Sequence, residues 1–213
     1  MAMVEAGGLE ALSINKLAEA VDYTPGALYR YFDSKDALLA QLVGRVLDEL
    51  RGHLLDALAR LPATARPLDR VLALIFEFCR FAERAPHRFG LLAVTLADPR
   101  VLLTDATQVE PVSRAMMAAL APMRDALDDA AGCGQLGRGE LAERTICMFA
   151  LLHGLLQLRK RADRAPALLD IKHLAARGSR ALLLGWGASS ATLDRSIARA
   201  AELSTLPRRR RRS

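Results

Sequence analysis

Apolar side chains recur every three or four residues through the long segments of this chain, and this spacing constrains the fold more than any other feature. Between Leu38 and Leu58 the apolar positions follow a period near that of an α-helix. Leucine and alanine dominate the composition, whereas aromatic residues make up only 5% of it, so helices are favoured over strands. No segment has a strand-like pattern. We therefore predict an all-α fold.

Glycines, prolines and capping residues divide the chain into predicted helices. Ser13 precedes a short helix over Ile14–Val21, and Thr24 with Pro25 opens a second one. The longer predicted helices are Lys35–Arg60, Leu68–Glu83, His87–Ala97, Val109–Ala130, Glu140–Arg164, Asp170–Leu184 and Ala191–Leu203. The stretch Gly132–Gly139 is predicted as a loop. It contains a G-x-G-x-x-G pattern, but a helix precedes it and no βαβ unit surrounds it, so a dinucleotide site is not expected.

The sequence lacks the residue patterns that several classes of protein need. No apolar run approaches the roughly 20 residues that a membrane-spanning helix needs, and no signal peptide opens the chain. Cys79, Cys133 and Cys147 lie far apart, and the histidines have no carboxylate or cysteine partner at ligand spacing. We predict a cytoplasmic protein with no metal, no cofactor and no membrane contact, which is not an enzyme.

Charge is distributed unevenly along the chain. The formal net charge is +6, yet residues 1–39 carry three basic and six acidic side chains. Five consecutive arginines, Arg208–Arg212, supply much of the excess. Residues 206–213 are predicted to be a disordered basic tail, and nonspecific attraction to phosphates is a further role for them. The basic balance is therefore not in itself a signal for DNA binding.

The most informative stretch is Leu12–Leu39, which reads L-S-I-N-K-L-A-E-A-V-D-Y-T-P-G-A-L-Y-R-Y-F-D-S-K-D-A-L-L. It predicts two short helices joined by a tight turn, followed by the start of a long helix. The small residues Gly26 and Ala27 open the second helix, where they would let the backbone approach a DNA groove. Hydroxyl and cationic side chains follow, and such groups hold phosphates. The pattern predicts a helix-turn-helix.

This stretch resembles the DNA-binding segment of TetR-family regulators, most closely over residues 24–39. The resemblance implies that bases or the adjacent groove face Thr24, Pro25, Gly26, Ala27 and Arg30. It implies that the phosphate backbone is held by Ser13, Tyr29, Tyr31 and Lys35. Packing within the helix is the alternative role for the two tyrosines.

The first helix of the family's DNA-binding domain is longer than the segment Met1–Ala6, which precedes two glycines here. We expect either that this helix is shortened or that the true start lies upstream of Met1. The predicted organisation is a helix-turn-helix domain over residues 1–45, a helical effector-binding and dimerisation domain over residues 46–205, and the basic tail.

The segment Ala150–Leu158 resembles the penultimate helix of many TetR-family members. With Ile171–Leu184 it would form a dimer interface of two helices from each subunit, as the resemblance implies. Small residues that allow close helix approach occur in both segments: Ala150, Gly154, Ala175, Ala176, Gly178 and Ala181. The alternative is that Ile146–Leu158 is an ordinary core helix within one subunit.

Phenylalanine, methionine and one histidine are the candidates for an effector pocket: Phe76, Phe78, Phe89, Met116, Met117 and His153. Such side chains line adaptable apolar pockets, although a plain core explains them as well. The resemblance implies a repressor that a small apolar or amphipathic effector releases from a palindromic operator. Its partners would be double-stranded DNA and a second copy of the chain. The alternative is a helical dimeric ligand-binding protein with impaired or lost DNA binding.

Overall fold

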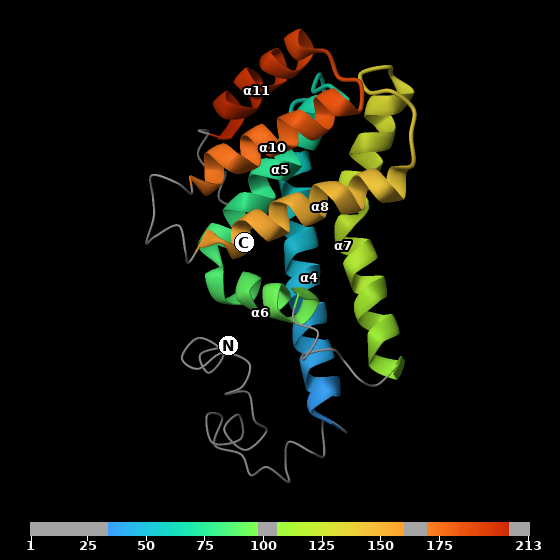
Figure 1. Cartoon of the computed structure of the whole chain (residues 1–213), viewed down its shortest axis with the longest axis vertical. Coiled ribbons are helices and arrows are strands. Elements are labelled where there is room, and N and C mark those ends of the chain that lie inside the picture. Colours follow the sequence, from blue (N-terminus) through green and yellow to red (C-terminus); the bar gives the residue numbers. More distant parts are fainter. Residues whose placement is uncertain (1–33, 98–105, 160–169, 205–213) are drawn as a thin grey trace. The chain divides into compact units, whose positions relative to one another are not determined.

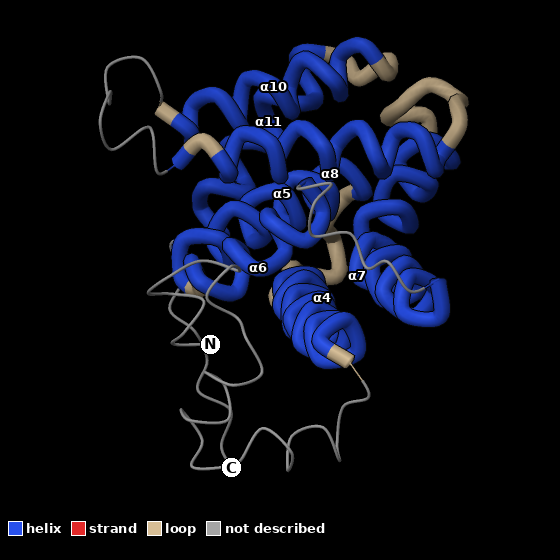
Figure 2. The backbone as a smooth tube through the Cα atoms, turned by 60° about the horizontal axis from the view of Figure 1, so that its bottom comes forward, coloured by secondary structure: helices blue, strands red, loops and turns tan. Residues whose placement is uncertain are grey.

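The computed structural model of the chain describes residues 34–97, 106–159 and 170–204, and every regular element in these ranges is a helix (Figures 1 and 2). The helices are α4 (Lys35–Ala59), α5 (Pro67–Arg84), α6 (Pro86–Ala97), α7 (Ala106–Gly132), α8 (Leu141–Gln157), α10 (Ile171–Gly185) and α11 (Ser190–Ser204). The prediction of an all-α fold is confirmed. The two short helices predicted before residue 33 and the basic tail lie outside the described residues.

Capping side chains fix where several of these helices begin. The hydroxyl of Ser34 accepts a hydrogen bond from the backbone N–H of Ala37, 3.0 Å away, at the start of α4. The carboxylate of Asp170 accepts one from His173 N–H at 3.0 Å, at the start of α10. Each bond satisfies a backbone donor that has no partner within the helix. The sequence-predicted start of the long helix after Ser34 is therefore confirmed.

Helix α8 is shorter than the predicted helix Glu140–Arg164. It ends at Gln157, and the backbone N–H of the following Leu158 points to the carbonyl oxygens of Leu155 and Leu156. These contacts tighten the last turn and end the regular series of hydrogen bonds between residues four apart, as short-range bonds often do at helix ends. Of the basic cluster predicted to complete this helix, Arg159 is helical after the interruption at Leu158, and Lys160 and Arg161 lie outside the described residues.

The described residues fall into two compact units. The first contains residues 34–52, 80–97 and 106–119, and the second contains residues 53–79, 120–159 and 170–204. Helices α4, α5 and α7 each contribute residues to both units. The predicted domain boundary between residues 45 and 46 stays a prediction.

The first unit is held by apolar side chains at helical spacing. On α4, Val43, Leu47 and Leu50 are almost wholly buried. On the other helices of this unit the buried side chains include Phe81, Phe89, Leu91, Leu92 and Val112. A surface ion pair joins Arg88 to Glu49. Because both partners are half-exposed, we attribute the stability of this unit to apolar burial rather than to that pair.

The second unit buries one face of each helix that it contains. Its buried apolar side chains include Leu54, Leu68, Leu74, Phe78, Leu127, Met148, Leu152, Leu183 and Leu193. Helix α10 packs against α8, and α11 turns back beside α10 (Figures 1 and 2). Gly178 leaves room for the side chain of Leu151 between α10 and α8, since a Cβ there would lie 2.9 Å from a terminal carbon of Leu151, which would have to shift.

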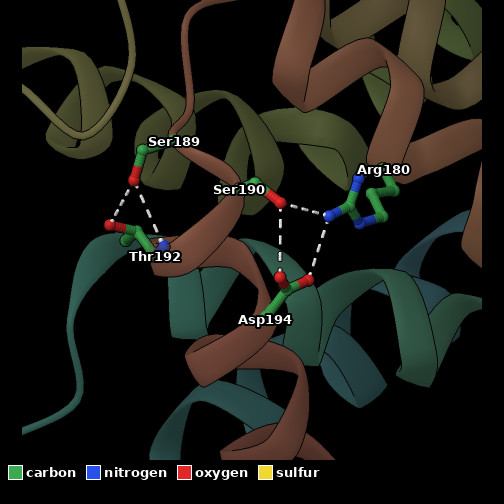
Figure 3. A network of polar contacts seen from close by, with 5 residues as sticks. All are labelled: Arg180, Ser189, Ser190, Thr192 and Asp194. Carbon is green, nitrogen blue, oxygen red and sulfur yellow. Dashed lines mark hydrogen bonds and ion pairs between the residues drawn. The ribbon is translucent and has the colours of Figure 1, made fainter.

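A polar network fixes the turn between α10 and α11 (Figure 3). The guanidinium of Arg180 on α10 donates to the Ser190 hydroxyl at 2.6 Å and to the Asp194 carboxylate at 3.0 Å. Beside it, the Ser189 hydroxyl accepts a hydrogen bond from Thr192 N–H at 3.2 Å and so caps α11. The turn therefore joins a side chain in the middle of α10 to the first turns of α11.

The loop between α7 and α8 is fastened to the end of α10. The guanidinium of Arg144 donates to the carbonyl oxygens of Gly137 (2.6 Å) and Arg138 (3.1 Å), and it lies 5.5 Å from the Trp186 ring centroid. The Gly137 N–H donates to the carbonyl oxygen of Trp186 at 2.8 Å. Arg144 is buried, and these carbonyls and the aromatic face stabilise its charge.

Two glycines of this region adopt positive φ angles and provide a matched test. Gly134 has φ +75° and open space where a Cβ would lie, whereas Gly187 has φ +95° and a Cβ there would lie 3.1 Å from the Gly137 nitrogen. We expect Gly134→Ala to cost about 1 kcal/mol of unfolding free energy for the left-handed backbone, and Gly187→Ala to cost about 1 kcal/mol more because of the backbone contact. Urea denaturation of both variants measures the difference, and equal losses would contradict the close approach.

Candidate functional site

The residues predicted to contact DNA lie almost entirely outside the described part of the chain. These residues are Ser13, Thr24, Pro25, Gly26, Ala27, Tyr29, Arg30 and Tyr31, and their roles stay predictions. Lys35 is the first residue of α4, although the placement of its side chain is not described. Its backbone position at a helix N-terminus fits the predicted phosphate contact, since helix N-termini attract anions.

One face of α8 is open in the isolated chain. Ile146 is 50% exposed, and Cys147, Ala150 and Gly154 follow it at helical spacing, each exposed. A Cβ on Gly154 would meet nothing within 4 Å. Small and apolar residues therefore form an exposed stripe along a helix whose sequence predicts burial on every side.

On α10 the predicted small residues separate into an exposed group and a group that faces the interior. Ala176 and Ala181 are exposed, whereas Ala175 is buried and Gly178 faces Leu151 of α8 within the subunit. Only part of the predicted small-residue set is therefore free to contact a second copy. We name the exposed residues Ile146, Cys147, Ala150, Gly154, Ala176 and Ala181 the open face.

A side of α8 adjacent to this stripe carries an aromatic cluster with a buried histidine. The rings of Phe149 and His153 are stacked with centroids 5.0 Å apart, and Phe78 of α5 meets Phe149 edge-on at 6.0 Å. His153 is 6% exposed, and desolvation by burial lowers its pKa below the usual value of 6.5. The imidazole is therefore neutral at physiological pH.

The other predicted effector residues are distributed over both units. Phe76 belongs to the second unit with Phe78 and His153, whereas Phe89, Met116 and Met117 belong to the first. Phe89 is buried and Met117 is 46% exposed, so these side chains do not share one kind of environment. Sequence reasoning missed Phe149. Its position four residues before His153 on one helix was the signal that could have found it.

Buried acidic side chains in the second unit have cationic partners. Glu77 is 3% exposed, and its carboxylate lies 3.0 Å from the Arg60 guanidinium and 3.6 Å from His53 Nδ1. Asp69 is similarly buried and lies 3.4 Å from the Arg199 guanidinium. These pairs compensate the cost of removing a carboxylate from water.

Within residues 34–97, 106–159 and 170–204, no group of three or more histidine, cysteine, aspartate or glutamate side chains is arranged to hold a metal ion. None of the described helices is long and apolar enough to cross a membrane. The geometry thus defines a class: a helical protein with an open face on two neighbouring helices and an aromatic cluster beneath one of them.

Comparisons with known proteins identify this class more closely. Residues 1–42 match the family described as bacterial regulatory proteins, tetR family. The HTH-type transcriptional repressor KstR of Rhodococcus jostii is 31% identical over 86 residues, which span 40% of this chain and 38% of that protein. The match therefore covers less than two-fifths of that relative's length.

A longer match joins the chain to the HTH-type transcriptional regulator BetI of Rhizobium meliloti, which is 28% identical over 76% of this chain and 74% of that protein. The crystal structure of the TetR-family regulator PfmR from Thermus thermophilus has the same fold, with a TM-score of 0.62, 17% identity and coverage of 85% of this chain and 93% of that one. The family match over residues 1–42 and the shared helical fold confirm the resemblance to the TetR family found in the sequence. That family is regulatory rather than enzymatic.

The lowered pKa of His153 makes a prediction about stability. The histidine of the unfolded state binds a proton near pH 6.5, whereas that of the folded state binds one only at lower pH. The free energy of unfolding therefore decreases as pH falls from about 7 through 6.5 towards the folded pKa. For each pH unit by which the folded pKa lies below the unfolded one, this decrease amounts to about 1.4 kcal/mol. We expect His153→Gln to weaken the pH dependence of the unfolding free energy in urea denaturation between pH 7.5 and 5. Parallel pH profiles for wild type and His153→Gln would contradict this assignment.

Proposed function

We propose that this protein is a dimeric, DNA-binding transcriptional repressor that a small apolar or amphipathic effector releases from a palindromic operator. The observation that carries the proposal is the sequence block Leu12–Leu39, which lies within the family match over residues 1–42. In this proposal residues 1–45 bind DNA, residues 46–205 bind the effector and a second subunit, and the protein acts in the cytoplasm.

The open face supports the dimer. Its exposed residues are small or apolar, so two copies could bring their helices close together around a two-fold axis. The charged side chains of Glu143 and Lys172 are exposed in the first turns of α8 and α10, where they would form part of a polar rim. Residues such as Gly178 stabilise the packing within each subunit and leave the open face available for association.

Gly154 gives a direct test of the dimer. Gly154→Arg places bulk and charge on the open face, whereas the space around Gly154 lets the subunit itself fold normally. We expect sedimentation velocity to show a dimer for wild type and a monomer for this variant. Gly52→Arg, at another exposed helical glycine with open space, is the matched control and should remain dimeric. A folded Gly154→Arg dimer would place the interface elsewhere.

The DNA contacts make a second test, in which two variants should fail in different ways. Lys35→Ala should weaken binding to operator and random DNA equally and reduce the slope of log affinity against log salt by about one, because one phosphate contact is lost. Ala27→Leu should instead reduce preference for the operator, because a bulky side chain keeps the recognition helix from entering the groove. The measurement is a salt titration with both DNAs, using an operator selected from a random pool.

The same titration separates the proposal from its alternative. Salt-dependent binding by the wild-type protein supports the regulator. A protein that dimerises and binds a small molecule but shows no salt-dependent DNA binding would instead be a helical ligand-binding protein. The excess of acidic residues over 1–39 motivates that alternative.

The aromatic cluster supports the effector part of the proposal. A neutral imidazole stacked on Phe149, whose ring Phe78 meets edge-on, offers an apolar surface with one hydrogen-bonding ring. In a thermal-shift screen, an apolar compound at 100 times its dissociation constant should stabilise the wild-type protein by about 2.7 kcal/mol. Phe149→Ala should reduce that shift more than Met117→Ala, at the exposed methionine. A crystal structure with a filled interior and no cavity of ligand size would contradict the effector.

A further inference from the structure

Two oppositely charged side chains on neighbouring helices of the second unit have no partner in the isolated chain. Glu143 stands in the first turn of α8 and Arg177 in the middle of α10, and both are exposed. Among the residues that the structure describes, no group forms an ion pair or a hydrogen bond with either side chain. Both charges are therefore available to a group outside the chain.

Both side chains lie in line with residues of the open face. Glu143 precedes Cys147 by four residues on α8, and Arg177 precedes Ala181 by four on α10, a spacing that puts side chains on one side of a helix. A partner that covers the open face would therefore also cover these two charges. Removing a charge from water is costly unless an opposite charge compensates it.

The packing of α8 on α10 keeps the two charges apart within one subunit. The helices run side by side in opposite directions, with Leu151 next to Gly178 and the first turn of α8 next to Trp186 (Figure 1). In this register Glu143 lies beside the end of α10, and Arg177 lies about nine residues away along the pair of helices. At 1.5 Å per residue this separation is about 14 Å, which is too long for an ion pair.

We propose that Glu143 forms an ion pair with Arg177 of the partner subunit, twice in each dimer, and that these two pairs set how the subunits dock. A two-fold axis that lies in the interface and crosses midway between the two side chains exchanges their positions, so each meets its counterpart on the other copy. The midpoint falls where Cys147 and Ala181 lie at about the same level of the two helices. These small side chains permit close approach at the axis. The inference rests on the proposed dimer and specifies its geometry.

The charges contribute mainly to the choice of docking geometry. An ion pair at the edge of an interface adds little affinity, whereas two like charges brought together disfavour a wrong arrangement. A docking of the open face in another register would cover the Arg177 guanidinium without a carboxylate beside it. Because the dimer is symmetric, each substitution acts at two contacts at once.

Charge reversal in the full chain tests the pairing. Sedimentation velocity over a range of concentrations gives the dimer dissociation constant for wild type, Glu143→Arg, Arg177→Glu and the variant with both substitutions. Each single variant puts like charges together at two contacts, so its dissociation constant should rise about tenfold or more. The double variant restores both pairs with the charges exchanged, so its dissociation constant should return to within about threefold of wild type.

A matched control and a salt series isolate the charge effect. Asp128 is an exposed acidic residue on α7 in the same unit, and it too has no ion pair or hydrogen bond with a described side chain. Asp128→Arg changes the net charge as Glu143→Arg does and should leave the dissociation constant unchanged. Raising the ionic strength to about 1 M should reduce the difference between each single variant and wild type, because salt screens exposed charges.

The outcomes separate this inference from the proposed dimer. A wild-type protein that stays monomeric at every concentration would overturn both. If Gly154→Arg dissociates the dimer but the single charge reversals leave it intact, the open face is the interface and the pairing is wrong. Single variants that weaken the dimer without rescue by the double substitution also overturn the pairing, because the two charges then act separately.

Discussion

The packing of α10 against α8 is the interaction on which the second unit depends. Gly178 leaves room for the Leu151 side chain between the two helices, because a Cβ there would lie 2.9 Å from a terminal carbon of that leucine. Once α8 is fixed in this way, its buried side chains point into the unit and its small residues remain outside. The rotation of one helix thus determines both where His153 lies and which residues form the open face.

Much of the fold follows from the sequence because breakers and caps act locally. The helices after Ser34 were predicted to within a few residues of their observed bounds, with α8 as the main exception. Its end depends on a tight last turn at Leu158, which leaves no mark in residue type. Helix ends of this kind are set by backbone hydrogen bonding that composition does not reveal.

The candidate site was less predictable, because it depends on which way each helix faces. Gly154 and Gly178 are the same residue type on two apolar helices, yet one faces open space and the other faces Leu151. Likewise, the phenylalanines and methionines proposed for one pocket include the buried Phe89 and the exposed Met117. Residue type indicates what a position can do, whereas orientation requires the three-dimensional packing. The DNA-binding residues were inferred from a sequence block alone and stay predictions.

The fastening of the α7–α8 loop to Trp186 has a consequence for the order of folding. The Gly137–Trp186 hydrogen bond joins segments separated along the chain by α8 and α10. Closing so long a stretch of chain costs entropy before the contact is gained, and such non-local contacts form slowly. The loop therefore cannot reach its final conformation as soon as α7 and α8 have formed. During synthesis the loop can form this hydrogen bond only after α10 has emerged and packed. The conformation of a loop in the middle of the chain therefore depends on a helix in its last third.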